Sequence, residues 1–275
     1  MARGLSSKTE GFAGAVLAEI DWSLPWFAPW RELGEPTARQ ALLKQSVAEA
    51  LNANANTTCA GLALGVVNEV KFVPQSALPD GQAYEDFIFK TAQVPTRDGL
   101  HDFFNGLCWH RFPLAKRRLN QLQALEIEAQ GIRHTRGPVR DALTLFDENV
   151  VLMHAPDAVW AALQARDWLG LFVDLRAQWQ HVHVVLFGHA LLEKLVTPYK
   201  SITGHVYRVD HHVNPHDEAA LDAWLVQDLQ PTKLATKPYE PLPVLGVPGW
   251  WAANAERAYY EDTQVFRPKR EVTAP

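Results

Sequence analysis

At 275 residues, with 47% hydrophobic and 21% charged residues, the chain is long enough for one large hydrophobic core or two modest ones. Its net charge of -5 excludes a surface built as a whole for nucleic acid, because neutralising phosphates requires clustered Lys and Arg. Its two cysteines, Cys59 and Cys108, lie far apart in apolar stretches, which argues against a disulfide framework. We interpret Cys108 as a small buried hydrophobe.

Two further patterns bear on location and partners. Glu19 and Asp21 interrupt the first apolar region, and no run approaches the ~20 apolar residues of a membrane span, so we expect a cytoplasmic protein without a membrane segment. The basic residues gather around 116–118 and again between 133 and 140. Adjacent charges on a helix point in different directions, so we interpret Lys116, Arg117 and Arg118 as a solvated face and rank nucleic-acid binding lowest.

The first part of the chain predicts irregular aromatic structure followed by helices. Residues 1–11 are expected to form a flexible lead. Pro25 and Pro29 prevent a long helix between Trp22 and Trp30, so this aromatic segment is expected to wrap a hydrophobic surface. Thr37 is a good N-cap for a helix that ends within residues 52–56. Residues 66–74 then predict a strand or strand pair, residues 80–81 a turn, and residues 84–88 a helix.

Three helices with recognisable ends follow. Asp98 is expected to cap a helix over 99–112, which Pro113 interrupts. The next helix runs from residue 114 to about 130 and stops at Gly131. Pro138 suits the first position of the third helix, which continues through Phe146.

The C-terminal half mixes strands and helices. Strands are predicted over 150–153 and 202–209, a helix begins at Asp157, and residues 168–179 suit a buried helix. Residues 181–187 fit either a strand or the start of the helix that contains His189. The aromatic residues of the tail predict that it docks on the core. Together these elements predict a predominantly helical α+β fold with a few short strands, as one compact domain over 12–268 with a tail at 269–275.

Several long motifs then occur in order. The runs are VPTRDGLHDFFNGLCWHRFP, RGPVRDALTLFDEN, LFGHALLEKL followed by PYKSITGHVY, and PGWW with VFRP near the end. From Trp22 to Pro268 the chain resembles a bacterial domain-of-unknown-function family, the one numbered 3025. The resemblance implies no activity, cofactor or catalytic residue, so function is argued from the chemistry of the residues.

The helix after Asp98 carries the first candidate site. His101 and Asn105 are four residues apart and share a face with Trp109, while Asp102 and Asn105 are three apart, so these polar groups can meet along one edge. One interpretation is a base or metal ligand oriented by a carboxylate. The alternative is a hydrogen-bonded core histidine beside an N-terminal charge.

The helix after Pro138 carries the second. Arg140, Thr144 and Asp147 share one face, and Arg140 could clamp a phosphate or carboxylate. Asp147 with Glu148 could bind a metal at the helix end. The alternative is an ion pair of Arg140 with Asp147 or Asp141.

The third candidate site follows Gly188. His189 and Glu193 are four apart and could bind one divalent metal, with His205 as a further ligand. A structural His–Glu pair is the alternative. Lys200 lies on a loop after Pro198, where it could bind a small anionic ligand. His211, His212 and His216 lie in polar sequence and are expected to face solvent.

Two hypotheses from different classes follow. The first is a hydrolase-like enzyme in which His101, Asp102, His189 and Glu193 converge, with or without a divalent metal, on a small or phosphorylated substrate. The second is a noncatalytic binding or scaffold protein in which the same groups are buried structural pins. In that case the aromatic surfaces of Trp26, Trp30, Trp250 and Trp251 would dock a partner.

Overall fold

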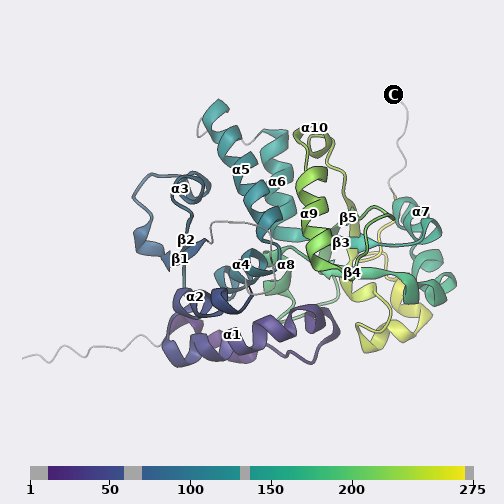
Figure 1. Cartoon of the computed structure of the whole chain (residues 1–275). Helices are drawn as coiled ribbons and strands as arrows, with labels where there is room; N and C mark the ends of the chain where they lie inside the picture. Colours follow the sequence, from purple (N-terminus) through teal and green to yellow (C-terminus); the bar gives the residue numbers. More distant parts are fainter. Residues whose placement is uncertain (1–11, 59–69, 131–136, 270–275) are drawn as a thin grey trace, which may run out of the picture.

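The N-terminal tryptophans lie on short helices, as their prolines require. In the computed structural model, which describes residues 12–58, 70–130 and 137–269, the 3-10 helices η1 (Ala13–Glu19) and η2 (Pro25–Trp30) open the chain (Figure 1). Trp26, Phe27 and Trp30 are fully buried. The aromatic segment therefore covers hydrophobic surface as expected, whereas the predicted lead over 1–11 lies outside the described residues.

The two helices that follow differ from the single helix predicted after Thr37. Because η2 runs directly into α1 (Arg31–Lys44), Thr37 lies inside α1, where its hydroxyl donates to the carbonyl oxygen of Leu33 at 2.6 Å. Gln45, with a left-handed φ of 52°, then separates α1 from α2 (Val47–Thr58). The N-cap prediction for Thr37 was wrong because the first turns of the helix form from the aromatic segment before it.

A small parallel sheet follows. The strands β1 (Lys71–Pro74) and β2 (Gln93–Thr96) pair in parallel, and α3 (Tyr84–Thr91) connects them. The predicted turn is present, with Gly81 at a φ of 79° that favours glycine. The strand β2 was not predicted, and residues 66–69 of the expected strand lie outside the described residues.

Three helices follow, namely α4 (Leu100–Arg111), α5 (Pro113–Gln130) and α6 (Pro138–Asn149); α4 lies in the middle of the view in Figure 1, and α5 and α6 rise side by side above it. Their positions agree with the sequence predictions, and Gly131 lies outside the described residues. Asp98 does not cap α4, however. Its Oδ1 accepts the backbone N–H of Val47 at 2.8 Å, so Asp98 caps α2, a partner that lies 51 residues earlier in the chain.

A four-stranded sheet of order β4-β3-β5-β6 fills the second half, with strands β3 (Val150–His154), β4 (His183–Leu186), β5 (Thr203–Arg208) and β6 (Glu240–Pro243). Strand β3 is parallel to β5 and antiparallel to β4, and β5 is antiparallel to β6. The helices between these strands are α7 (Asp157–Ala165), α8 (His189–Lys194), α9 (Glu218–Asp228) and α10 (Pro231–Leu234). The fold is thus α+β and mostly helical.

The last aromatic residues dock on the core, as predicted. The segment over 168–179 is helical as expected but not one regular α-helix: it consists of the short π-helix η5 (Gly170–Asp174) and the 3-10 helix η6 (Arg176–His181). Phe172 of η5 stacks on Tyr260 of η9 (Arg257–Glu261), with 5.0 Å between the ring centres, and Phe266 is buried beside them. None of the described helices combines the length and the apolar composition that a membrane crossing needs.

The N-terminal segment also fixes α8 in place. The indole N–H of Trp26 donates to the carbonyl oxygen of Leu195 at 3.2 Å, just after α8, and that of Trp30 donates to Leu186 at 3.1 Å, just before it. Because both rings are buried, the prediction that Trp26 and Trp30 present a docking surface was wrong. Their polar atoms are used inside the molecule, which is the usual arrangement for a buried indole.

Candidate functional site

Six polar side chains meet where four helices approach one another. Helix α4 contributes His101 and Asn105, α5 contributes Lys116, α6 contributes Asp147, and α8 contributes His189 and Glu193. We call these six residues the polar cluster. The helical spacing of four residues within α4 and within α8 puts each pair on one face, as predicted.

The outer part of the polar cluster reaches solvent. His101 Nδ1 lies 2.9 Å from Glu193 Oε2, and both side chains are 38% exposed. The other ring nitrogen of His101, Nε2, lies 3.1 Å from Nε2 of His189, whose side chain is only 6% exposed. An accessible histidine therefore links an accessible carboxylate to a buried histidine.

The inner part is almost closed to solvent. The ammonium group of Lys116 donates to Asp147 Oδ1 and, at 2.8 Å, to Asn105 Oδ1. The Asn105 amide in turn donates to the hydroxyl of Tyr84 at 3.2 Å. The Lys116 side chain is only 4% exposed, so the interpretation of Lys116 as part of a solvated face was wrong. It lies on the face of α5 that also buries Leu119, and the carboxylate of α6 compensates its charge.

Burial and neighbouring charges shift the pKa values of the inner groups. Burial lowers the pKa of His189 to about 4, and the positive charges of Lys116 and His101 act in the same direction, against the attraction of Asp147. Burial alone would raise the pKa of Asp147, but Lys116 and His189 outweigh it and hold that pKa below its usual value. At neutral pH, His189 is therefore neutral and Asp147 is ionised.

These charges restrict where protons lie. An ionised carboxylate only accepts hydrogen bonds, so His101 Nδ1 carries a proton and donates it to Glu193. One further proton lies between His101 Nε2 and His189 Nε2, because one of these two nitrogens must donate to the other. His189 Nδ1 makes no hydrogen bond and lies 3.8 Å from Asp147 Oδ2. This separation is too long for a hydrogen bond. Each histidine thus has a carboxylate near Nδ1 and presents Nε2 to the other histidine.

Backbone contacts set the position of the two helix starts. The N–H groups of Phe187 and Gly188 both donate to the carbonyl oxygen of Val150, which ties the start of α8 to strand β3. At α4, Asp102 accepts from the Arg97 backbone N–H at 2.6 Å and from its Nε at 2.9 Å. Asp102 therefore clamps the loop before α4, whereas His101 beside it faces Glu193.

Three other predicted site residues lie elsewhere. Lys200 pairs with Asp262 at 2.8 Å, near the docked tail. His205 lies on β5, half-buried, where burial lowers its pKa. Arg140 is buried in α6 and forms no ion pair with any described residue, since Asp147 pairs with Lys116, and Asp141 lies 3.7 Å from Lys237. The ligand atoms of His189, Glu193 and His205 do not meet at one point.

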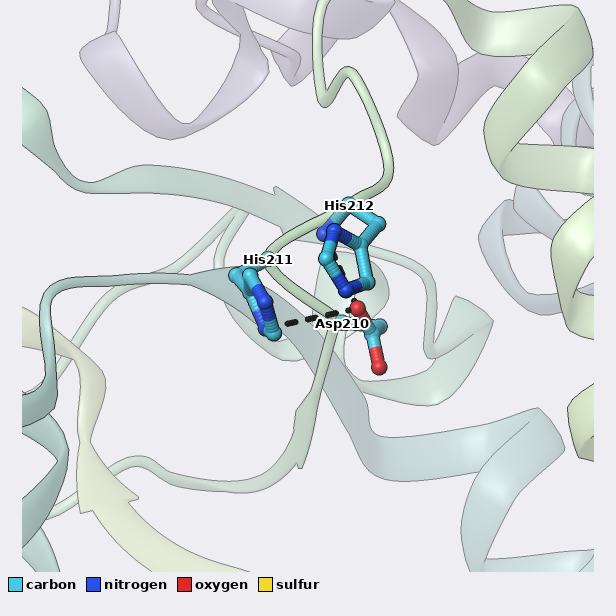
Figure 2. Close-up of side chains that lie close together, drawn as sticks. All are labelled: Asp210, His211 and His212. Carbon is cyan, nitrogen blue, oxygen red and sulfur yellow. Dashed lines mark hydrogen bonds and ion pairs between the residues drawn. The ribbon is translucent and has the colours of Figure 1, made fainter.

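Within the described ranges, a single group of three side chains could reach one metal ion together: Asp210, His211 and His212. They follow one another on the exposed turn after β5, and Asp210 also accepts the backbone N–H of His212 at 2.9 Å (Figure 2). Since all three come from one turn, they could contact an ion from one side only. His211, His212 and His216 are exposed, as expected from the sequence.

The model of the family described as "Protein of unknown function (DUF3025)" matches residues 70–270, which is more than half of the chain. The chain belongs to this family. All six members of the polar cluster of this DUF3025 protein lie within the match. No curated protein and no solved structure matches the chain.

Sequence reasoning missed one member of the cluster, Lys116. The sequence contained a signal for it, because Lys116 lies three residues before Leu119, on the apolar face of its helix. A lysine on a core face requires a buried partner. For Cys108 the interpretation was correct: it is fully buried, and burial raises the pKa of its thiol to about 12.

Proposed function

We propose that this protein is a hydrolase-like enzyme in which His101 transfers protons to and from a water molecule and a small substrate. The observation that carries the proposal is the 3.1 Å contact between the Nε2 atoms of His101 and His189, with Glu193 on the opposite side of His101. A carboxylate on Nδ1 fixes the orientation of an imidazole and stabilises its protonated form, which is what a general base requires.

The two histidines have different environments, which suits them to different roles. His101 is accessible, so a substrate or water can reach its ring, whereas buried His189 stays neutral at pH 7; a proton taken from water is therefore held on His101, on the path from the Glu193 carboxylate to His189 Nε2. At the inner end of this path, Asp147 lies beside His189 and pairs with Lys116. Pairs of titratable groups whose environments separate their pKa values are typical of acid–base sites.

Arg97, a cationic side chain beside the exposed end of the polar cluster, favours an anionic substrate. Arg97 is two-thirds exposed while its guanidinium binds Asp102, and the attraction of Glu193 contributes to the raised pKa of Arg97 after the larger effect of Asp102. Because Asp102 follows His101 on α4, the guanidinium that binds it lies at the start of the helix that carries His101. We infer that a small carboxylate or phosphate ester fits this exposed end best.

The possible metal-ligand atoms of the polar cluster favour proton transfer over metal catalysis. Two imidazole Nε2 atoms 3.1 Å apart could share one divalent ion, with the carboxylates behind them as outer partners. Catalytic zinc sites, however, usually take three protein ligands, and no described residue supplies a third at this point.

The test compares the wild-type protein with His101→Gln, Glu193→Gln and the control His212→Gln, which removes an exposed histidine from the turn after β5. Chromogenic phosphate and carboxylate esters serve as substrates, and metal content is measured on the same untagged samples. We expect kcat/KM to fall about 10²- to 10⁴-fold in His101→Gln, and less in Glu193→Gln, with unchanged melting temperatures. The control should match the wild-type protein.

A structural role is the second candidate, because the Lys116, Asn105 and Tyr84 contacts are buried and mutually satisfied. In that case the protein would hydrolyse none of the esters, and His101→Gln would lower the melting temperature without changing any activity. Stoichiometric metal lost in His101→Gln would instead show that the two histidines bind an ion.

A further inference from the structure

Trp109 of α4 borders both the polar cluster and a cavity. The ammonium nitrogen of Lys116 lies 5.4 Å from the centre of the Trp109 ring. The Trp109 side chain also lines a cavity of about 390 Å³ between α3, α5 and α9. Most of the cavity wall is apolar, with Val70, Ile88, Phe89, Trp109, Leu114 and Val226. The cavity is open to solvent, and its volume and mostly apolar lining fall within the range of small-molecule sites.

One arginine in this wall has neither a counter-ion nor a hydrogen-bond partner among the described residues. Arg117 follows Lys116 on α5 and lines the cavity, while Lys116 points into the polar cluster. The buried Nε of Arg117 makes no hydrogen bond, and Arg117 forms no ion pair with any residue in the ranges that the structure describes. Burial lowers its pKa, and no carboxylate opposes that effect. An unpaired, partly buried guanidinium favours an anion.

The neighbouring arginine shows the contrast. Arg118 also lines the cavity, but its guanidinium donates to Gln121 Oε1 at 3.0 Å and to the carbonyl oxygen of Leu229 at 3.4 Å. Two of its three guanidinium nitrogens, Nε and Nη1, are therefore used within the protein. Arg117 alone of the two donates no hydrogen bond to any described residue, which leaves its guanidinium for a ligand.

We propose that this cavity binds a small amphipathic anion, with its carboxylate on Arg117 and its apolar body against Ile88, Trp109 and Leu114. A free metal cation is excluded, because two arginines and no acidic side chain line the wall. Phe89, which is half exposed, lies in the wall where a ligand could enter from solvent. The site is separate from the His101–His189 pair, and its existence does not depend on the hydrolase proposal.

Calorimetric titration of the full chain with octanoate and with 1-octanol tests the proposal. The two probes share an apolar body and differ in the charged head. We expect saturable 1:1 binding of octanoate, weakened about 10- to 100-fold by Arg117→Gln, and weaker binding of 1-octanol that this substitution does not change. Retained 1-octanol binding shows that Arg117→Gln is folded. Absence of saturable octanoate binding, or equal octanoate affinity in Arg117→Gln and wild type, overturns the proposal.

Two further variants locate the ligand. Arg257→Gln removes the same charge from η9, which lies well away from α5 in Figure 1, and should leave octanoate affinity unchanged. Val226→Phe, on α9, adds volume to the cavity wall and should abolish binding of both probes. If octanoate still binds Val226→Phe with wild-type affinity, the ligand lies elsewhere and the proposal is wrong.

Discussion

A Cβ atom on Gly188 would lie 2.5 Å from the backbone nitrogen of Asn149, a distance that real Cβ contacts do not show. Gly188 directly precedes α8, and Asn149 ends α6, so the missing side chain lets the two helices approach each other. This approach brings His189 of α8 close to Asp147 of α6. The geometry of the polar cluster therefore depends on a backbone contact.

Gly188→Ala tests this dependence. Because the atoms that the new methyl group meets belong to the backbone, α8 must shift, and we expect a loss of about 1–3 kcal/mol in the free energy of unfolding, measured by urea denaturation. Gly99→Ala is the control, since nothing lies within 4 Å of a Cβ there. Equal stability of the two variants would contradict the argument.

Lys116→Met tests the buried ion pair. The substitution keeps the length of the side chain but leaves Asp147 without its main counter-charge, so we expect a loss of about 3 kcal/mol in unfolding free energy at pH 7. The loss should shrink in the double variant with Asp147→Leu, in which no charge remains to be compensated. Additive losses in the double variant would show that the two residues do not interact.

His189 should make stability fall in acid. Its pKa is lowered to about 4 in the folded protein from ~6.5 in the unfolded chain, so the unfolded chain binds more protons between these values. The stabilisation is complete above pH 6.5 and is lost as the pH falls through 4, by at most about 3 kcal/mol. Urea midpoints at pH 7 and pH 4.5, measured with EDTA present, should differ less in His189→Gln than in the wild-type protein and in His212→Gln.

Asp222 should act in the opposite direction. Its carboxylate accepts the backbone N–H groups of Leu114 and Ala115 at the start of α5, but burial outweighs these bonds and raises its pKa to about 6. The protonated form is favoured on folding, so its contribution is complete below pH 3.8 and is lost as the pH rises through 6. The stability of the wild-type protein relative to Asp222→Asn should therefore be higher at pH 4 than at pH 7. A difference that does not change with pH would show that burial does not control this group.

Much of the candidate site was predictable where it depends on local spacing. The four-residue intervals between His101 and Asn105, and between His189 and Glu193, put each pair on one helix face, and the structure has both pairs in the polar cluster. The partners across the cluster were not predictable, because Glu193 binds His101 from a helix 92 residues away. Local patterns do not encode which helices meet.

The same distinction applies to the fold. Helices with proline and glycine boundaries, such as α5 and α6, were located from the sequence because those residues act on their own backbone. The roles of Thr37 and Asp98 were misassigned because each depends on a contact with another segment. Asp98 caps α2, and the first turns of α1 form before Thr37.

The two indole hydrogen bonds to the ends of α8 come from outside the region that the family model matches. The family match begins at residue 70, yet Trp26 and Trp30 come from the part of the chain before it. A protein shortened to begin at Val70 would keep every residue of the cluster and lose both anchors of the helix that carries His189 and Glu193. The segment that carries Trp26 and Trp30 therefore belongs in any fragment used to study this site.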